Sequence, residues 1–142
     1  MKTRSKYIVA ALIALWLVGM LSLTPEFLRL HAEAKDALQT VSVYSDDLVG
    51  NRYNQAYQYS SEAFRAALPF DQFVTLYSGL TKQYGSLKTV SRRGYQVNGH
   101  GSPMAWKAIV DEDFAYEKKT LRFEFVLHKE NGRWVIFSAE EL

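Results

Sequence analysis

The sequence predicts an α+β fold in which helices come first and an antiparallel sheet follows. Up to Gly85, apolar residues recur at helical spacing, and beyond it they alternate with polar residues at the period of a strand. Asn131 followed by Gly132 is a tight-turn signal between the last two alternating segments. Helices followed by hairpin-connected strands are typical of a layered fold with helices on one face of a sheet.

The composition is that of one folded domain. Of the 142 residues, 48% are hydrophobic and 14% are aromatic, which disfavours disorder. The net charge of +2 is too small to indicate a nucleic-acid-binding protein. The chain has no cysteine, so disulfides and thiolate metal sites are excluded.

The N-terminal segment resembles a membrane anchor. Residues 7–23 carry no charge and follow Lys2, Arg4 and Lys6. As a helix this run is roughly 25 Å long, just enough to span a bilayer with help from its flanks. Basic residues before the run favour a cytoplasmic N-terminus. We therefore expect a membrane anchor at residues 1–24 and one extracytoplasmic domain at 25–142, which is periplasmic if the protein is bacterial.

Two alternatives to a retained anchor stay open at this point. A cleaved signal peptide has the same basic and apolar regions, but no small-x-small cleavage pattern stands near Leu23. The nearest one, at residues 32–34, lies beyond the charged Glu26 and Arg29. A buried helix of a cytosolic protein is the second alternative.

Three helical segments are expected after the anchor. Thr24 and Pro25 have the pattern of a helix start, with the alternative that the anchor helix runs on into it. Apolar residues then recur at helical spacing up to Gly50. A short helical region follows at 53–68, with a fresh start at residue 60. Asp71 is expected to cap a third helix that Gly85 ends.

Four strands are expected near residues 87–97, 105–116, 120–128 and 133–139. Residues 98–103 carry turn signals and predict a loop. Alternating aromatic residues should fill the core beneath the sheet. They are Trp106, Phe114, Tyr116, Phe123, Phe125, Trp134 and Phe137.

The order of these elements resembles the NTF2-like (cystatin-like) superfamily, including its small membrane-anchored or exported members of unassigned role. The resemblance covers roughly residues 34–142 and rests on four segments, LVGNRYNQAY (48–57), SEAF (61–64), YGSL (84–87) and KENGRWVI (129–136). It implies about three helices packed on a curved four-stranded antiparallel sheet, which together form a cone. The cones of this superfamily hold a small molecule, a partner or nothing, so the fold does not choose among functions.

Candidate ligand-binding residues are those expected to line such a cone. They are Tyr53, Tyr57, Tyr77, Tyr84, Trp106 and His128. Superfamily enzymes such as ketosteroid isomerases place an acid or histidine base beside a tyrosine, which Asp111 or His128 would provide here. The acidic run 111–113, however, has the pattern of a solvated turn or strand edge, where a carboxylate is a poor base. No catalytic residue is therefore assigned.

Neither a metal nor a cofactor is expected. His31, His100 and His128 are scattered and lack the spacing of a metal site. A set of basic residues is expected to solvate the outer sheet face, with contact to anionic lipid as the alternative. These residues are Arg92, Arg93, Lys118, Lys119 and Arg122.

The sequence thus favours a membrane-tethered, non-enzymatic binding module, plausibly part of an envelope assembly. A carrier of a small apolar ligand, or an isomerase-like enzyme that uses the cone, is the main alternative. Pairing of two copies through their sheet faces is a third hypothesis.

Overall fold

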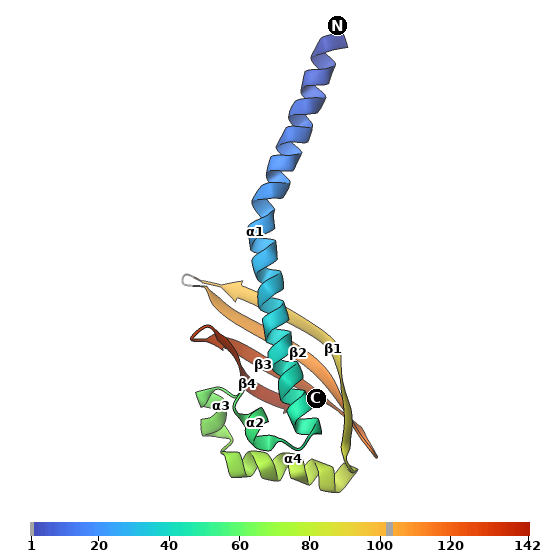
Figure 1. Ribbon diagram of the computed structural model, residues 1–142, viewed down its shortest axis with the longest axis vertical. Helices are drawn as coiled ribbons and strands as arrows, with labels where there is room; N and C mark the ends of the chain where they lie inside the picture. The colour runs from blue at the N-terminus through green and yellow to red at the C-terminus, as the bar shows by residue number, and fades with distance from the viewer. Residues whose placement is uncertain (1, 102–103) are drawn as a thin grey trace. The chain divides into compact units, whose positions relative to one another are not determined.

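The computed structural model describes residues 2–101 and 104–142, and side chains from residue 25 onward. It has two compact units, Met1–Ala32 and Glu33–Leu142. Four helices precede four strands (Figure 1). The elements are α1 (Lys2–Val49), α2 (Tyr53–Tyr57), α3 (Glu62–Ala67), α4 (Phe70–Tyr84), β1 (Leu87–His100), β2 (Ala105–Tyr116), β3 (Thr120–Glu130) and β4 (Arg133–Glu141).

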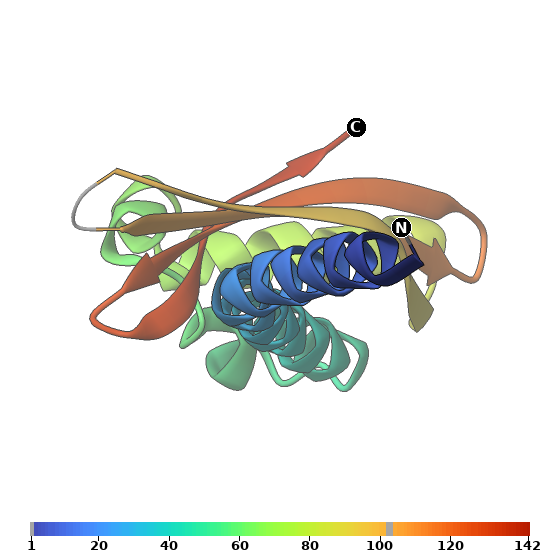
Figure 2. The same ribbon diagram turned by 90° about the horizontal axis from the view of Figure 1, so that it is seen from above.

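The four strands form one antiparallel sheet in the order β1-β2-β3-β4, each paired with its neighbour in the chain. Within the unit Glu33–Leu142, the helices lie on one side of this sheet (Figures 1 and 2). We call the side of the sheet that faces them the inner face and the other side the outer face. The predicted α+β class is confirmed.

The expected transmembrane helix needs correction. Among the described residues, no helix is long and apolar enough to span a membrane. The apolar run 7–23 itself falls on residues whose side chains lie outside the description. The predicted placement of the domain outside the cytoplasm is not tested by the structure and stays a prediction.

Helix α1 begins earlier than the sequence pattern indicates. No helix starts at Thr24, because α1 runs from Lys2 through Pro25 without a break, as the alternative of a continuous helix predicts. Its predicted end is confirmed, since Asn51 adopts the left-handed conformation with φ of 55° directly after the last turn. An asparagine tolerates this conformation better than most residues.

Helices α3 and α4 begin in different ways. Ser61 caps α3 by accepting a hydrogen bond from the backbone N–H of Phe64 at 3.0 Å. The predicted cap at Asp71 is wrong, because α4 begins two residues earlier with Pro69 as its cap, and Asp71 lies inside its first turn. The acid still suits that place because helix N-termini carry partial positive charge.

The strands follow the predicted alternation with two corrections. Strand β1 continues to His100, so residues 98–100 pair with β2 and are not a loop, while residues 102–103 of the predicted loop lie outside the description. Phe137, expected in the core, is 40% exposed. The hairpin turn is confirmed, because Asn131 and Gly132 have φ of 50° and 78°, as a type I′ turn requires.

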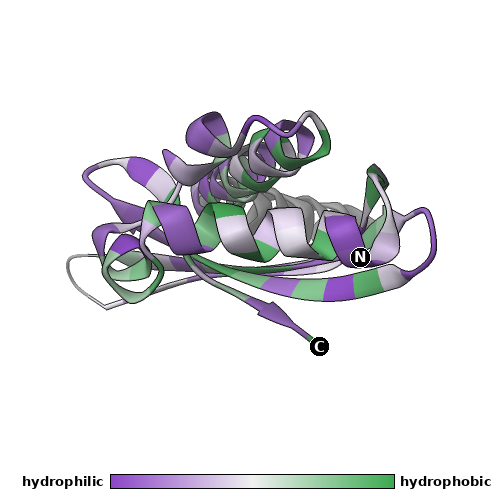
Figure 3. Ribbon diagram, turned by 90° about the horizontal axis from the view of Figure 1, so that it is seen from below, coloured by the Kyte–Doolittle hydropathy of each residue, from purple (hydrophilic) through white to green (hydrophobic). Residues whose placement is uncertain are grey.

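The core fills the space between the inner face of the sheet and the helices. Val41, Tyr44 and Leu48 of α1 and Phe73 and Tyr77 of α4 belong to it. The sheet contributes alternate residues, as the banding of hydrophobic and hydrophilic positions along its strands indicates (Figure 3). On β3 these are Leu121, Phe123, Phe125 and Leu127, as the sequence predicts.

Candidate binding sites

The space expected to be an open cone is filled by aromatic side chains. Tyr44, Phe73 and Phe125 have no exposed surface. The Tyr44 ring lies edge-on to both others, with centroids 5.5 Å from Phe125 and 6.3 Å from Phe73. Such contacts are the packing of a closed core rather than the walls of a pocket.

Two tyrosine hydroxyls satisfy each other inside this core. The hydroxyl oxygens of Tyr44 and Tyr77 are 2.9 Å apart. Burial raises the pKa of Tyr77 to about 12 and that of Tyr44 well above its ordinary value. Burial also raises the pKa of the neighbouring Tyr116. These phenols therefore stay neutral at physiological pH and act as structural hydrogen-bonding groups.

The predicted cone-lining tyrosines lie in the core or along its margin. Tyr77 is 3% exposed, whereas Tyr53, Tyr57 and Tyr84 are half-buried and pack against the core from outside it. The Tyr57 hydroxyl donates a hydrogen bond to the carbonyl oxygen of Leu68 at 2.9 Å. These four side chains therefore contribute to the packing of the core.

The remaining two predicted site residues lie on opposite faces of the sheet. Trp106 is on the inner face of β2, half-buried and in phase with the buried Ala108. His128 follows the inward Leu127 on β3, so it lies on the outer face, where its ring stacks on Phe137 at 4.4 Å. The two side chains therefore cannot line one cone.

The acidic run 111–113 is neither a turn nor a strand edge, because β2 is a central strand. Its side chains alternate between faces, and Glu112 lies on the inner face at 2% exposure. The Ser45 hydroxyl donates to Glu112 Oε2 at 2.6 Å, and an Arg92 nitrogen lies 3.7 Å from Oε1. The sequence prediction of a wet acidic segment is wrong for this residue.

Burial raises the pKa of Glu112, while the Ser45 hydrogen bond and the Arg92 charge partly oppose that rise. A signal for this buried acid exists in the sequence, since Glu112 is in phase with Val110 and Phe114. Both hydrogen-bonding and ionic contacts bind the carboxylate to the fold. Its surroundings are those of a structural acid between α1 and the sheet.

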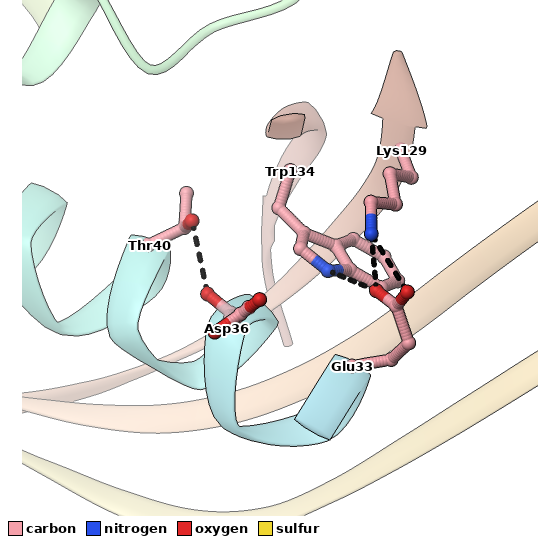
Figure 4. A network of polar contacts seen from close by, with 5 residues as sticks. All are labelled: Glu33, Asp36, Thr40, Lys129 and Trp134. Atoms are coloured by element: carbon pink, nitrogen blue, oxygen red, sulfur yellow. Dashed lines mark hydrogen bonds and ion pairs between the residues drawn. The ribbon is translucent and has the colours of Figure 1, made fainter. Parts of the chain in front are cut away.

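A second buried carboxylate lies at the other end of the inner face (Figure 4). Glu33 is 9% exposed, and both of its oxygens lie 2.7 Å from Lys129 Nζ. The indole N–H of Trp134 donates to Oε2 at 3.1 Å. This network joins residue 33 of α1 to the β3–β4 hairpin. No sequence motif predicts it.

Charged residues of both signs occupy one corner of the outer face. Asp113 accepts hydrogen bonds from Arg93 at 2.6 Å and from Arg122 at 3.4 Å. The Arg93 hydrogen bond lowers the pKa of this carboxyl, with Arg122 adding to the effect. A cavity of about 410 Å³ lies here, and Lys119 also lines it.

The expected basic stripe is divided between the faces of the sheet. Arg92 turns to the inner face, where it approaches Glu112 and donates to the carbonyl oxygen of Leu38 at 3.2 Å. Arg93 and Arg122 are on the outer face beside Asp113. Pairing with this acid disperses the positive charge that a lipid contact would need.

Apolar residues interrupt the charges in the middle of the outer face. Ile109 of β2 and Val126 of β3 are register partners on this face, both half-buried. Phe137 of β4 occupies an extra position in the pairing of β3 with β4, beside Val126. We call Ile109, Val126 and Phe137 the outer strip.

The three histidines belong to three different elements, α1, β1 and β3. Across residues 2–101 and 104–142, no group of three or more His, Cys, Asp or Glu could hold a metal ion. His31 stacks on Phe27 with centroids 6.5 Å apart, and His100 ends β1.

Comparisons with protein-family models and with curated proteins found no match to this chain.

Proposed function

We propose that the unit Glu33–Leu142 is an NTF2-like interaction module that binds a protein surface and performs no catalysis. The order of helices and strands, with all helices on one face of a four-stranded meander, supports the resemblance seen in the sequence. The carrier and enzyme alternatives need an open cone, whereas Tyr44, Phe73 and Phe125 fill that space. The binding surface is therefore on the outside.

The observation that carries the proposal is the outer strip. Sheet faces that remain in water normally alternate to polar residues, yet here Ile109, Val126 and Phe137 stand together. Phe137 is 40% exposed and adjoins the half-buried Val126, so the strip is a contiguous apolar patch rather than a single exposed side chain. An apolar centre surrounded by charges is the usual anatomy of a protein interface.

The occupant that best fits this face is a second copy of the chain. A two-fold interface must be self-complementary, and the outer face carries basic Arg93 and Arg122 beside acidic Asp111 and Glu124. Asp111 Oδ1 is buried and has no hydrogen-bond partner among the described residues. A basic side chain of the second copy would supply the missing donor.

Sedimentation velocity of the full chain at rising concentration tests this proposal. The wild type is expected to form a dimer, and Val126→Lys is expected to stay monomeric because it places a charge in the outer strip. Leu76→Lys is the matched control, since it places the same charge on an exposed leucine of α4 and should leave the dimer intact. A wild type that is monomeric throughout, or a Val126→Lys dimer, contradicts the proposal.

A further inference from the structure

A second cavity, of about 210 Å³, lies beside the hairpin that joins β3 to β4. Ser60, which lies just before α3, and Glu62 and Arg65 of α3 line one side of it. Glu130, Asn131 and Arg133 of the hairpin line the other side. Neither the outer strip nor the closed core contributes to this cavity, so it is independent of the proposed interface.

Backbone hydrogen bonds hold the two sides of this cavity together. The backbone N–H of Ser61 donates to the carbonyl oxygen of Ile136, and the N–H of Ile136 donates to that of Tyr59, both at 2.8 Å. They form a parallel bridge between Ser60 and Ile136 at the free edge of β4. A site with walls fixed in this way loses little freedom when it binds a ligand.

Two adjacent serines in this wall differ in a way that points to a ligand. Ser61 is 1% exposed, and its hydroxyl oxygen is used as the cap of α3. Ser60 is 3% exposed and lines the cavity, yet its hydroxyl has no hydrogen-bond partner among the described residues. A buried hydroxyl normally has a partner, so the Ser60 hydroxyl is available to whatever enters the cavity.

The charged residues around the cavity have no net charge and form no ion pairs with one another. Arg65 and Arg133 supply two positive charges, and Glu62 and Glu130 supply two negative ones. None of the ion pairs formed within the described part of the chain joins these four residues. Arg65 is held in place, because its Nη2 donates to the carbonyl oxygen of Gln58 at 2.9 Å.

We propose that this cavity binds a small zwitterion that carries a carboxylate and an ammonium group. The two arginines suit the carboxylate, the two glutamates suit the ammonium group, and the Ser60 hydroxyl adds a neutral hydrogen bond. A rim of zero net charge favours a ligand of zero net charge over a simple anion or cation. The volume is below that of drug-sized pockets, which limits the ligand to the size of an amino acid or a dipeptide.

Titration of the ¹⁵N-labelled full chain, followed by NMR, tests the proposal. The probes are glycine, L-serine and glycylglycine, and the single-charge controls are acetate and methylammonium. Zwitterions are expected to shift the amide signals of residues 60–62 and 130–133 saturably, and the controls are not. Binding of glycine and L-serine without glycylglycine identifies the ligand as a free amino acid, and the reverse identifies it as a dipeptide. Absence of any saturable shift with all three zwitterions overturns the proposal, as does equal binding of acetate.

Two pairs of variants locate the site. Arg133→Gln is expected to weaken zwitterion binding about tenfold, because it removes a charged hydrogen bond. Lys82→Gln, an exposed charge removed from α4, should leave the affinity unchanged. Ser60→Ala should weaken binding several-fold without loss of thermal stability, since its hydroxyl bonds to no described residue, and Ser78→Ala on α4 is its control. Unchanged affinity in both Arg133→Gln and Ser60→Ala contradicts the assignment.

Discussion

Neighbouring acids on the two faces of the sheet have pKa values shifted in opposite directions. Glu112 and Asp113 are adjacent on β2, yet burial raises the pKa of Glu112 on the inner face, while the Arg93 hydrogen bond lowers that of Asp113 on the outer face. Strand alternation alone places one in the core and one in water. The face of the sheet on which each carboxylate lies therefore decides the direction of its pKa shift.

The same contrast holds for the other polar groups of the sheet. On the inner face the hydroxyls of Tyr44 and Tyr77 pair with each other, and Glu33 binds Lys129. On the outer face Asp111 Oδ1 has no partner among the described residues. These polar groups of the inner face are paired, whereas this carboxylate oxygen of the outer face is not.

The largest expected effect is on the inner network at Glu33. Glu33→Ala leaves the ammonium of Lys129 and the indole N–H of Trp134 without their acceptor, and should lower the free energy of unfolding by about 3 kcal/mol. Glu33→Gln keeps an acceptor for Trp134 and should cost less. Urea denaturation of both variants measures the difference, and equal losses would show that the hydrogen bond to Trp134 contributes nothing.

The tyrosine pair should give the next largest effect and a strong coupling. Tyr44→Phe or Tyr77→Phe alone leaves one buried hydroxyl unpaired, which costs about 2 kcal/mol. The double variant removes both hydroxyls and should cost less than the sum of the single variants. A double-mutant cycle by urea denaturation tests this, and simple additivity contradicts a mutual hydrogen bond.

The raised pKa of Glu112 should make the free energy of unfolding depend on pH. Because its pKa is raised, the folded chain binds this proton more tightly than the unfolded chain, and stability falls as pH rises from the ordinary glutamate value through the raised one. Glu112→Gln removes this contribution. The wild type should therefore gain stability relative to the variant as pH is lowered through that window. If the free energy of unfolding changes with pH in the same way in the wild type and in Glu112→Gln, the pKa of Glu112 is not raised.

The smallest effect is expected when a glutamate of the outer face is replaced by glutamine. Glu124 of β3 is the register partner of Asp111, the residue directly before Glu112. Glu124→Gln should change the free energy of unfolding of the single chain at neutral pH by less than about 0.5 kcal/mol, because this side chain is only half-buried there and is not part of the core. A loss as large as that of Tyr44→Phe would mean that the outer face is also part of the folded core.

Periodicity predicted most of this fold because each element buries one side. The alternation of Leu121, Phe123, Phe125 and Leu127 and the Asn131–Gly132 turn are local patterns, and the structure confirms them. No helix starts at Thr24, and α1 continues through Pro25 although a proline removes one backbone hydrogen bond from a helix. Helix bounds thus depend on forces that no short motif encodes.

The candidate site was harder to predict, because it depends on which face each residue occupies. His128 was expected inside, but one step along β3 from the buried Leu127 places it outside. The contact of Glu33 with Lys129, and that of Ser45 with Glu112, join residues far apart in the sequence. Only the folded chain brings such pairs together, so sequence motifs could not identify them.

Methyl NMR of the full chain on dilution tests the central claim most directly. Ile109 and Val110 are neighbours on opposite faces of β2, and Val126 and Leu127 are neighbours on opposite faces of β3. If the outer face binds a second copy, the methyl signals of Ile109 and Val126 shift with concentration while those of Val110 and Leu127 stay constant. Signals that all stay constant, or that shift only for Val110 and Leu127, contradict this account.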